Sequence, residues 1–110
     1  MKLVTCLLPP ARLEAVKKAL WDKGWRGFTV SAAQGLGLQR GSMARDDEFV
    51  SSFQNRVRLE VACRDNELEA LLELLVDNAR SGRVGDGKIF VTELVEVVRV
   101  RTGEKGDAAL

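Results

Sequence analysis

The chain has 110 residues, a length that fits one domain. Lys and Arg total 17 against 16 for Asp and Glu, so the chain lacks the basic excess typical of nucleic-acid-binding proteins. It contains no histidine, which excludes zinc sites of the Cys/His type and Ser-His-Asp triads.

The cysteines and the apolar runs indicate where the protein works. Cys6 and Cys63 form no CxxC pair, so we interpret them as small apolar residues in a reducing compartment. No apolar run is long enough for a membrane span, and the N-terminus lacks a signal-peptide pattern. We therefore expect a cytoplasmic protein that does not insert into a membrane.

Apolar periodicity predicts the elements in chain order. A strand over 2–8 ends at Pro9-Pro10, and a helix follows from Ala11 to near Gly24. A second strand opens over 27–30, and Trp21 and Trp25, which precede it, are expected in core or interface packing.

Residues 35–53 show no period and predict a long loop, which in a small domain is usually functional or disordered. Alternation over 57–63 predicts a third strand, and the leucine stripe over 68–76 predicts a helix capped by Asp65 or Asn66. A last extended region runs over 88–101, before a polar tail.

The order β-α-β-β-α-β predicts an α+β fold of the ferredoxin-like type, in which two helices pack on one face of a four-stranded antiparallel sheet. The strands are rich in apolar residues, so we expect much of the other face to be apolar as well. Such a face favours self-association.

Three segments carry groups suited to binding an anion. Gly85-Asp86-Gly87-Lys88 allows a backbone nest beside a lysine, and Arg99 and Arg101 would share one face of a strand. Gly35 to Gly41 is a glycine-rich loop without the following helix of a dinucleotide fingerprint. Taken singly, the first is better explained by an ordinary turn and the second by a solvated edge strand, and a lone glycine cluster is a weak signal. Together they favour binding a nucleotide without transforming it.

The run from Gly82 to Val91, followed by Arg99-Val100-Arg101-Thr102-Gly103-Glu104, closely resembles the C-terminal signature of the PII nitrogen-regulatory signalling proteins. The resemblance covers the whole chain and implies a single domain over 1–110 that forms a compact homotrimer. It implies a T-loop over about 37–53, a nucleotide-binding loop over 81–88 and a C-terminal loop over 102–110. Nucleotide sites would lie in the clefts between subunits, where ATP and ADP compete and MgATP supports binding of 2-oxoglutarate.

The resemblance also assigns roles to single residues. Gly85, Asp86, Gly87 and Lys88 would line the phosphate site, and Arg99 and Arg101 would reach it from the adjoining subunit. The other expected nucleotide contacts are Thr29, Gly35, Gly37, Gln39, Arg40 and Glu60. Gln39 would face the magnesium ion, and 2-oxoglutarate would meet Gln39, Arg56 and Gly85.

Departures from the family pattern concern the T-loop and the oxoacid site. The loop is about two residues short, and Phe49 stands where modified family members carry a tyrosine, so that modification is unavailable. Leu38 replaces an arginine that contacts phosphate, and Arg56 replaces a lysine that pairs with 2-oxoglutarate; an arginine there needs a different geometry. Arg45 aligns with the arginine that plugs ammonium channels.

The resemblance thus predicts a regulator that is not an enzyme. It would act on a transporter of the ammonium-channel type or on a metabolic enzyme, with Arg45 and Phe49 as partner contacts, and would not bind nucleic acid. The alternative is a divergent PII-like sensor of AMP, a cyclic nucleotide or bicarbonate. A small phosphatase is disfavoured by the absence of histidine, and an RNA-recognition domain by the absence of tyrosine.

Overall fold

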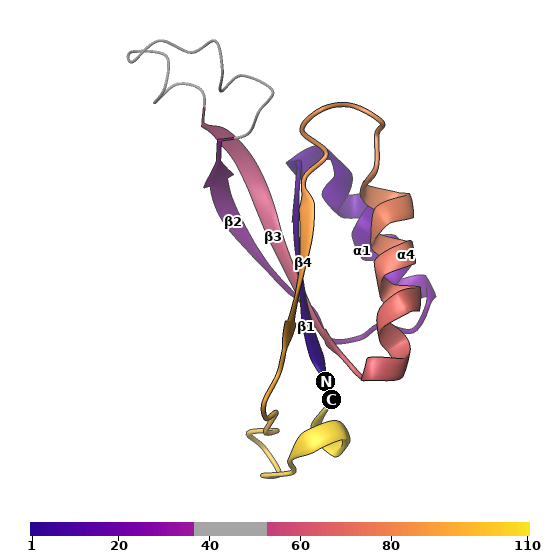
Figure 1. Cartoon of the computed structure of the whole chain (residues 1–110), viewed down its shortest axis with the longest axis vertical. Helices are drawn as coiled ribbons and strands as arrows, with labels where there is room; N and C mark the ends of the chain where they lie inside the picture. The colour runs from indigo at the N-terminus through magenta and orange to yellow at the C-terminus, as the bar shows by residue number, and fades with distance from the viewer. Residues whose placement is uncertain (37–52) are drawn as a thin grey trace.

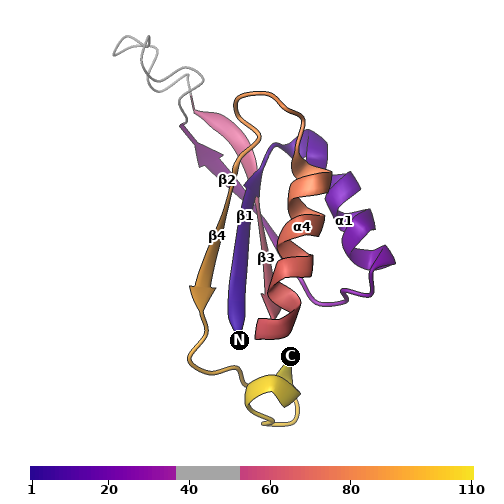
Figure 2. The same ribbon diagram turned by 45° about the vertical axis from the view of Figure 1, so that its right-hand side comes forward.

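A computed structural model describes residues 1–36 and 53–110, which form one antiparallel sheet with two helices on one of its faces. The sheet order is β2-β3-β1-β4, and α1 packs beside α4 (Figures 1 and 2). This confirms the predicted ferredoxin-like α+β fold. The elements are β1 (Lys2–Leu8), η1 (Pro10–Arg12), α1 (Leu13–Asp22), β2 (Thr29–Gly35), β3 (Gln54–Cys63), η2 (Asp65–Glu67), α4 (Leu68–Ala79), β4 (Lys88–Glu93) and η3 (Gly106–Ala109).

The core lies between the sheet and the two helices. Alternate residues of the central strands β1 and β3 are buried against the helices, and each helix contributes an apolar stripe. Burial of each large side chain stabilises the fold by about 1.5–3 kcal/mol. The fully buried side chains are Val4, Leu8, Val16, Leu20, Leu59, Val61, Cys63, Leu71 and Leu75.

The first helix begins later than the sequence suggests. Residues Pro10–Arg12 form a 3₁₀ turn, with a proline at its first position, and α1 follows from Leu13 to Asp22. Gly24 then takes a φ of +92°, as expected for a glycine that ends a helix. Trp25 packs partly buried against the core, whereas Trp21 is 58% exposed and stacks 3.8 Å from the Arg26 guanidinium.

The second helix is not capped by Asp65 or Asn66, because both residues lie within η2. Glu67 instead accepts a hydrogen bond from the Arg64 backbone N–H at 2.9 Å. Asp65 makes an ion pair with the amino group of Met1 at 2.7 Å. The Asp65 carboxylate, which the local sequence predicts as a helix cap, is instead paired with the amino group of a residue distant in sequence.

The strand β2 starts at Thr29 rather than at Gly27 and extends to Gly35. Its small residues pair with β3 from Thr29↔Glu60 to Gly35↔Gln54. Gly35, where the predicted glycine-rich loop begins, is therefore the last residue of β2.

Only the first part of the last extended region predicted over 88–101 forms a strand. The strand β4 ends at Glu93, opposite Lys2, and residues 94–110, the C-terminal segment, fold separately below the sheet (Figure 1). Val98 and Lys105 form an isolated antiparallel bridge around a turn, and Gly103 and Gly106 have positive φ. The prediction that Arg99 and Arg101 share a strand face is therefore wrong.

The face of the sheet turned away from the helices is mixed in character rather than largely apolar. Half-buried Leu3 and Leu7 lie there with Phe90, which is 49% exposed. Their neighbours in register include Thr5, Arg58, Glu60, Lys88 and Thr92.

Candidate anion-binding site

The loop between α4 and β4, residues 81–88, turns through three glycines with left-handed backbone. Gly82, Gly85 and Gly87 take φ angles of +82°, +100° and +104°, a region that favours glycine. Within the described part of the chain, the backbone N–H groups of Val84 and Gly85 have no hydrogen-bond partner. The loop thus offers donors that a bound anion would satisfy.

Asp86 closes this loop on itself. Its Oδ2 accepts hydrogen bonds from the Ser81 N–H at 2.8 Å and the Gly82 N–H at 2.9 Å, and its Oδ1 accepts one from the Ser81 hydroxyl. The Ser81 hydroxyl bond, followed by the backbone bonds, holds the pKa of Asp86 below its usual range. The carboxylate is therefore ionised at neutral pH and committed to the loop.

Gly87 sets how closely the loop approaches the sheet. A Cβ at this position would lie 1.7 Å from the carbonyl oxygen of Leu7, which no side chain tolerates. The close approach starts β4 at Lys88, opposite Leu7 at the end of β1. Lys88 itself is exposed there, so its ammonium group is available beside the loop.

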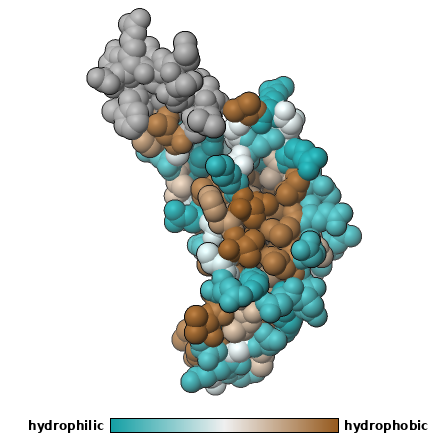
Figure 3. Space-filling model, in the orientation of Figure 1, coloured by the Kyte–Doolittle hydropathy of each residue, from teal (hydrophilic) through white to brown (hydrophobic). Residues whose placement is uncertain are grey.

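A cavity of about 300 Å³ lies beside the loop, between β4 and the end of α4. Apolar surface gathers over this region, with polar side chains around it (Figure 3). The site therefore combines an apolar floor with charged groups at its rim. Its lining residues are Cys6, Leu7, Val76, Ala79, Arg80, Asp86, Gly87, Lys88 and Ile89.

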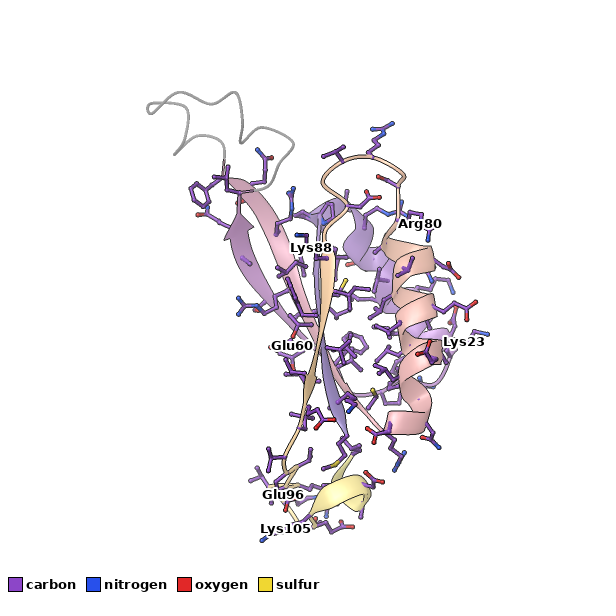
Figure 4. The ribbon with its side chains drawn as sticks, viewed as in Figure 1. Lys23, Glu60, Arg80, Lys88, Glu96 and Lys105 are labelled. Carbon is purple, nitrogen blue, oxygen red and sulfur yellow. The ribbon has the colours of Figure 1, made fainter. Side chains whose placement is uncertain are left out.

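Thr29 and Glu60 are register partners on the sheet face turned away from the helices. Glu60 accepts a hydrogen bond from the Thr5 hydroxyl at 3.2 Å, and in Figure 4 it lies lower on the sheet than Lys88. Gly35 lies at the end of β2, where β3 begins. All three lie within strands β2 and β3, and none of them lines the cavity beside the loop.

Arg56 lies on β3 opposite Ala33, and its Nη1 donates to the Asn55 carbonyl at 3.0 Å. It lines a second concavity of about 630 Å³ along β2 and β3, together with Gln34 and Asn55. The predicted residues Gly37, Gln39, Arg40, Arg45 and Phe49, and most of the T-loop with them, lie outside the described residues.

The two arginines of the C-terminal segment lie far from the 81–88 loop of the same chain. Figure 4 shows Lys88 near one end of the sheet, and Glu96 and Lys105 beyond the other. The strand β4 between them, Lys88–Glu93, spans about 17 Å. Arg99 pairs with Glu104 at 2.7 Å and donates to the Ala108 carbonyl at 3.1 Å. Arg101 is exposed and makes no hydrogen bond or ion pair with the described residues.

Arg12 is a residue near the site that sequence reasoning missed. Its Nη2 donates to the carbonyls of Asn78 at 2.9 Å and Arg80 at 3.3 Å, where α4 ends and the loop begins. Only the tertiary fold brings η1 to this helix end, so no sequence pattern identifies Arg12. The Ser81 to Asp86 spacing, a serine and an aspartate flanking two glycines, is the one local signal of the closed loop.

Among residues 1–36 and 53–110, no group of three Cys, Asp or Glu side chains could hold a metal ion. No helix in the same ranges is long and apolar enough to cross a membrane.

Burial raises the pKa of the Cys6 thiol to about 11, so this thiol is neutral and unreactive at neutral pH.

Comparison with known proteins gives consistent results. The family model "Nitrogen regulatory protein P-II" matches residues 1–104. The chain is 44% identical to a nitrogen regulatory protein P-II of Azospirillum brasilense and 42% identical to the nitrogen regulatory protein GlnK of Escherichia coli, in each case over the full length of both chains. A crystal structure of Arabidopsis thaliana PII bound to citrate superposes with a TM-score of 0.84 at 34% identity, covering 99% of this chain and 91% of the other.

Proposed function

Because the chain belongs to the P-II family of nitrogen regulatory proteins, we propose that it senses ATP and ADP at the 81–88 loop and signals through its T-loop. The relatives are named as regulators, and none of the names describes an enzyme. These names state neither a nucleotide nor a mode of signalling, so both belong to the proposal.

The 81–88 loop is the observation that carries the proposal. It offers the N–H groups of Val84 and Gly85, which have no partner among the described residues, the exposed ammonium of Lys88 and a cavity of about 300 Å³ beside them. Backbone donors, together with a point charge, suit the several negative charges of a nucleotide polyphosphate. The citrate named in the Arabidopsis structure is also a small polyanion, which agrees with this chemistry.

We propose further that the working unit is a homotrimer with one site between each pair of subunits. Arg101 is free of described partners but lies about 17 Å or more from the loop of its own chain. A neighbouring copy would bring it to the phosphates. Val95 and Val100, each 98% exposed, and Phe90 at 49% supply apolar surface for such an assembly.

In the proposed site, Thr29 and Glu60 would lie near the adenine and ribose, Gly35 and Gly37 would contribute backbone, and Arg40 would be a further nucleotide contact. A magnesium ion would be held by the phosphates, with Gln39 as the protein ligand. Arg56 carries the charge needed for a carboxylate of 2-oxoglutarate and lies beside a concavity of about 630 Å³. Binding of 2-oxoglutarate is therefore proposed as a second event that requires MgATP.

Signalling would follow from a change in the T-loop. A ligand shifts a conformational equilibrium only by its difference in affinity for the two states, so ATP and ADP must favour different T-loop forms. We propose that Arg45 and Phe49 then contact a partner, either a membrane transporter of the ammonium-channel type or a metabolic enzyme.

Calorimetric titration of Lys88→Ala and Arg101→Ala with ATP and with ADP tests the nucleotide site. Each variant should bind at least about tenfold more weakly, because each removes a charge-assisted bond to phosphate. Lys23→Ala is the matched control, since Lys23 is exposed and remote from the loop (Figure 4). It should bind like the wild type.

Unchanged affinity in both variants, with melting temperatures like that of the wild type, would overturn this site. The same titrations with AMP, a cyclic nucleotide and bicarbonate address the alternative sensor. If one of these binds while ATP and ADP do not, the chain is a divergent member of its family. If 2-oxoglutarate fails to bind beside MgATP, Arg56 has changed what is sensed.

A further inference from the structure

We propose that Arg12 and Asp86 form a clamp that fixes the shape of the 81–88 loop, so that both residues promote anion binding by positioning the loop rather than by touching the ligand. This inference rests on the proposed function for its binding readout. It changes the role expected of Asp86, which sequence resemblance placed among the residues lining the phosphate site. Arg12 has no expected role from sequence.

The first half of the clamp holds the end of α4. The helix stops abruptly, because Arg80 turns to an extended backbone (φ −69°, ψ 132°) and no glycine cap follows directly. Its last carbonyls therefore need other donors. Arg12, from η1, supplies them by bonding the carbonyls of Asn78 and Arg80. The residue before the loop is thereby fixed to another element.

Arg12 is held there at a cost, which argues that the contact matters. Its Nε is buried and has no hydrogen-bond partner among the described residues. An unsatisfied buried donor is unfavourable, so the two carbonyl bonds must offset this. The positive charge of Arg12 also contributes, less than the Ser81 and Gly82 hydrogen bonds do, to lowering the pKa of Asp86.

The second half of the clamp joins the two ends of the loop. Asp86 receives both N–H groups of Ser81 and Gly82 as well as the Ser81 hydroxyl, and Ser81 Oγ in turn accepts from the Arg83 N–H at 3.3 Å. The entry of the loop is thus tied to its exit, directly before Gly87 meets β1. The N–H groups of Val84 and Gly85 remain at the tip, between these two fixed ends.

The two possible roles of Asp86 predict opposite effects of Asp86→Asn on the affinity for a polyanion. If the carboxylate faced the ligand, Asp86→Asn would remove like-charge repulsion and strengthen the binding of a polyanion. If the carboxylate is a clamp, the same change replaces a charged acceptor with a neutral amide, which holds the Ser81 and Gly82 N–H groups more weakly, loosens the loop and weakens binding. We expect ATP affinity to fall about tenfold, as for loss of one hydrogen bond to a charged group.

The experiment uses the full-length protein and two readouts. Calorimetry gives ATP affinity, and hydrogen exchange of the nucleotide-free protein reports the protection of the Ser81 and Gly82 amides. Asp77→Asn, an exposed aspartate on α4, is the matched control and should change neither. Arg12→Lys keeps the charge, but the lysine side chain ends one bond short of the place of Nη2, the atom that donates to both carbonyls, so it should weaken ATP binding in the same direction.

Two results would overturn the clamp: unchanged or tighter ATP binding by Asp86→Asn, or unchanged protection of the Ser81 and Gly82 amides in that variant. If Arg12→Lys alone lowers the melting temperature, the double variant with Asp86→Asn decides, because a shared clamp requires non-additive losses of affinity. If the wild type binds neither ATP nor ADP, the proposed function fails, and the amide protection of the free protein still tests the clamp by itself.

Discussion

Gly87 combines a positive φ of +104° with a backbone approach that leaves no room for a side chain. Gly87→Ala should therefore lower the free energy of unfolding by more than about 3 kcal/mol, from strain plus the clash with Leu7. Gly82→Ala is the matched control, because Gly82 also has a positive φ but no atom lies within 4 Å of the place that a Cβ would take. Strain alone should cost that variant about 1 kcal/mol.

Urea unfolding of both glycine variants measures this difference directly. Equal stabilities would mean that the loop moves off β1 easily, and that Lys88 is not fixed by the end of β1. The comparison separates two reasons for a glycine, left-handed backbone and close approach, which a sequence pattern cannot distinguish.

At the scale of elements, the C-terminal segment depends on Arg99. Its guanidinium joins Glu104 and the carbonyl of Ala108, across the turn closed by the Val98–Lys105 bridge. Arg99→Ala should raise hydrogen exchange of the Gly103 and Gly106 amides roughly tenfold, without changing exchange in the sheet.

Arg101→Ala provides the control for this prediction, because Arg101 lies in the same turn and has no bond to the described residues. It should leave exchange unchanged while it weakens ATP binding. If Arg101→Ala also loosens the segment, the division into a structural arginine and a ligand-binding arginine is wrong.

Sequence pattern predicted β1, β3 and α4 well because their apolar residues follow a period of two or of 3.6 and are buried as that period requires. It failed after Glu93 for a reason outside the local pattern. Glu93 is opposite Lys2, and the Leu94 N–H bonds the carbonyl of Met1, so β1 offers no further residue for pairing. The apolar residues from 94 onward therefore turn away from the sheet.

For the candidate site, the glycine positions and Lys88 could be predicted because turns and charges leave a local signature. The contacts of Asp86 and Arg12 could not, since they depend on where α4 ends relative to η1. The resemblance placed the two arginines at the loop of an adjoining subunit, and the fold shows that one chain alone does not bring them to its own loop.

At the scale of the whole molecule, the separation of Lys88 from Arg101 makes the proposed assembly testable. Lys88→Ala and Arg101→Ala should complement each other when the two chains are mixed by co-refolding. A site built between neighbours needs an intact half from each, so about one site in four should recover wild-type ATP affinity.

Titration of the mixture gives the fraction of restored sites, and each variant refolded alone is the control. Restoration would show that the site is shared between chains. No recovery, although both variants assemble and exchange subunits, would place both residues within one chain or remove one of them from the site.

The absence of tyrosine has a consequence for optical measurement. All near-ultraviolet emission must come from Trp21 and Trp25, with only phenylalanine beside them. The two indoles differ in surroundings, since Trp21 is 58% exposed against Arg26 and Trp25 packs on the core. Replacing Trp21 with phenylalanine would leave a chain with a single tryptophan, set in the connection between α1 and β2. Folding, assembly and ligand binding could then be followed by the intrinsic fluorescence of Trp25, without attaching a dye.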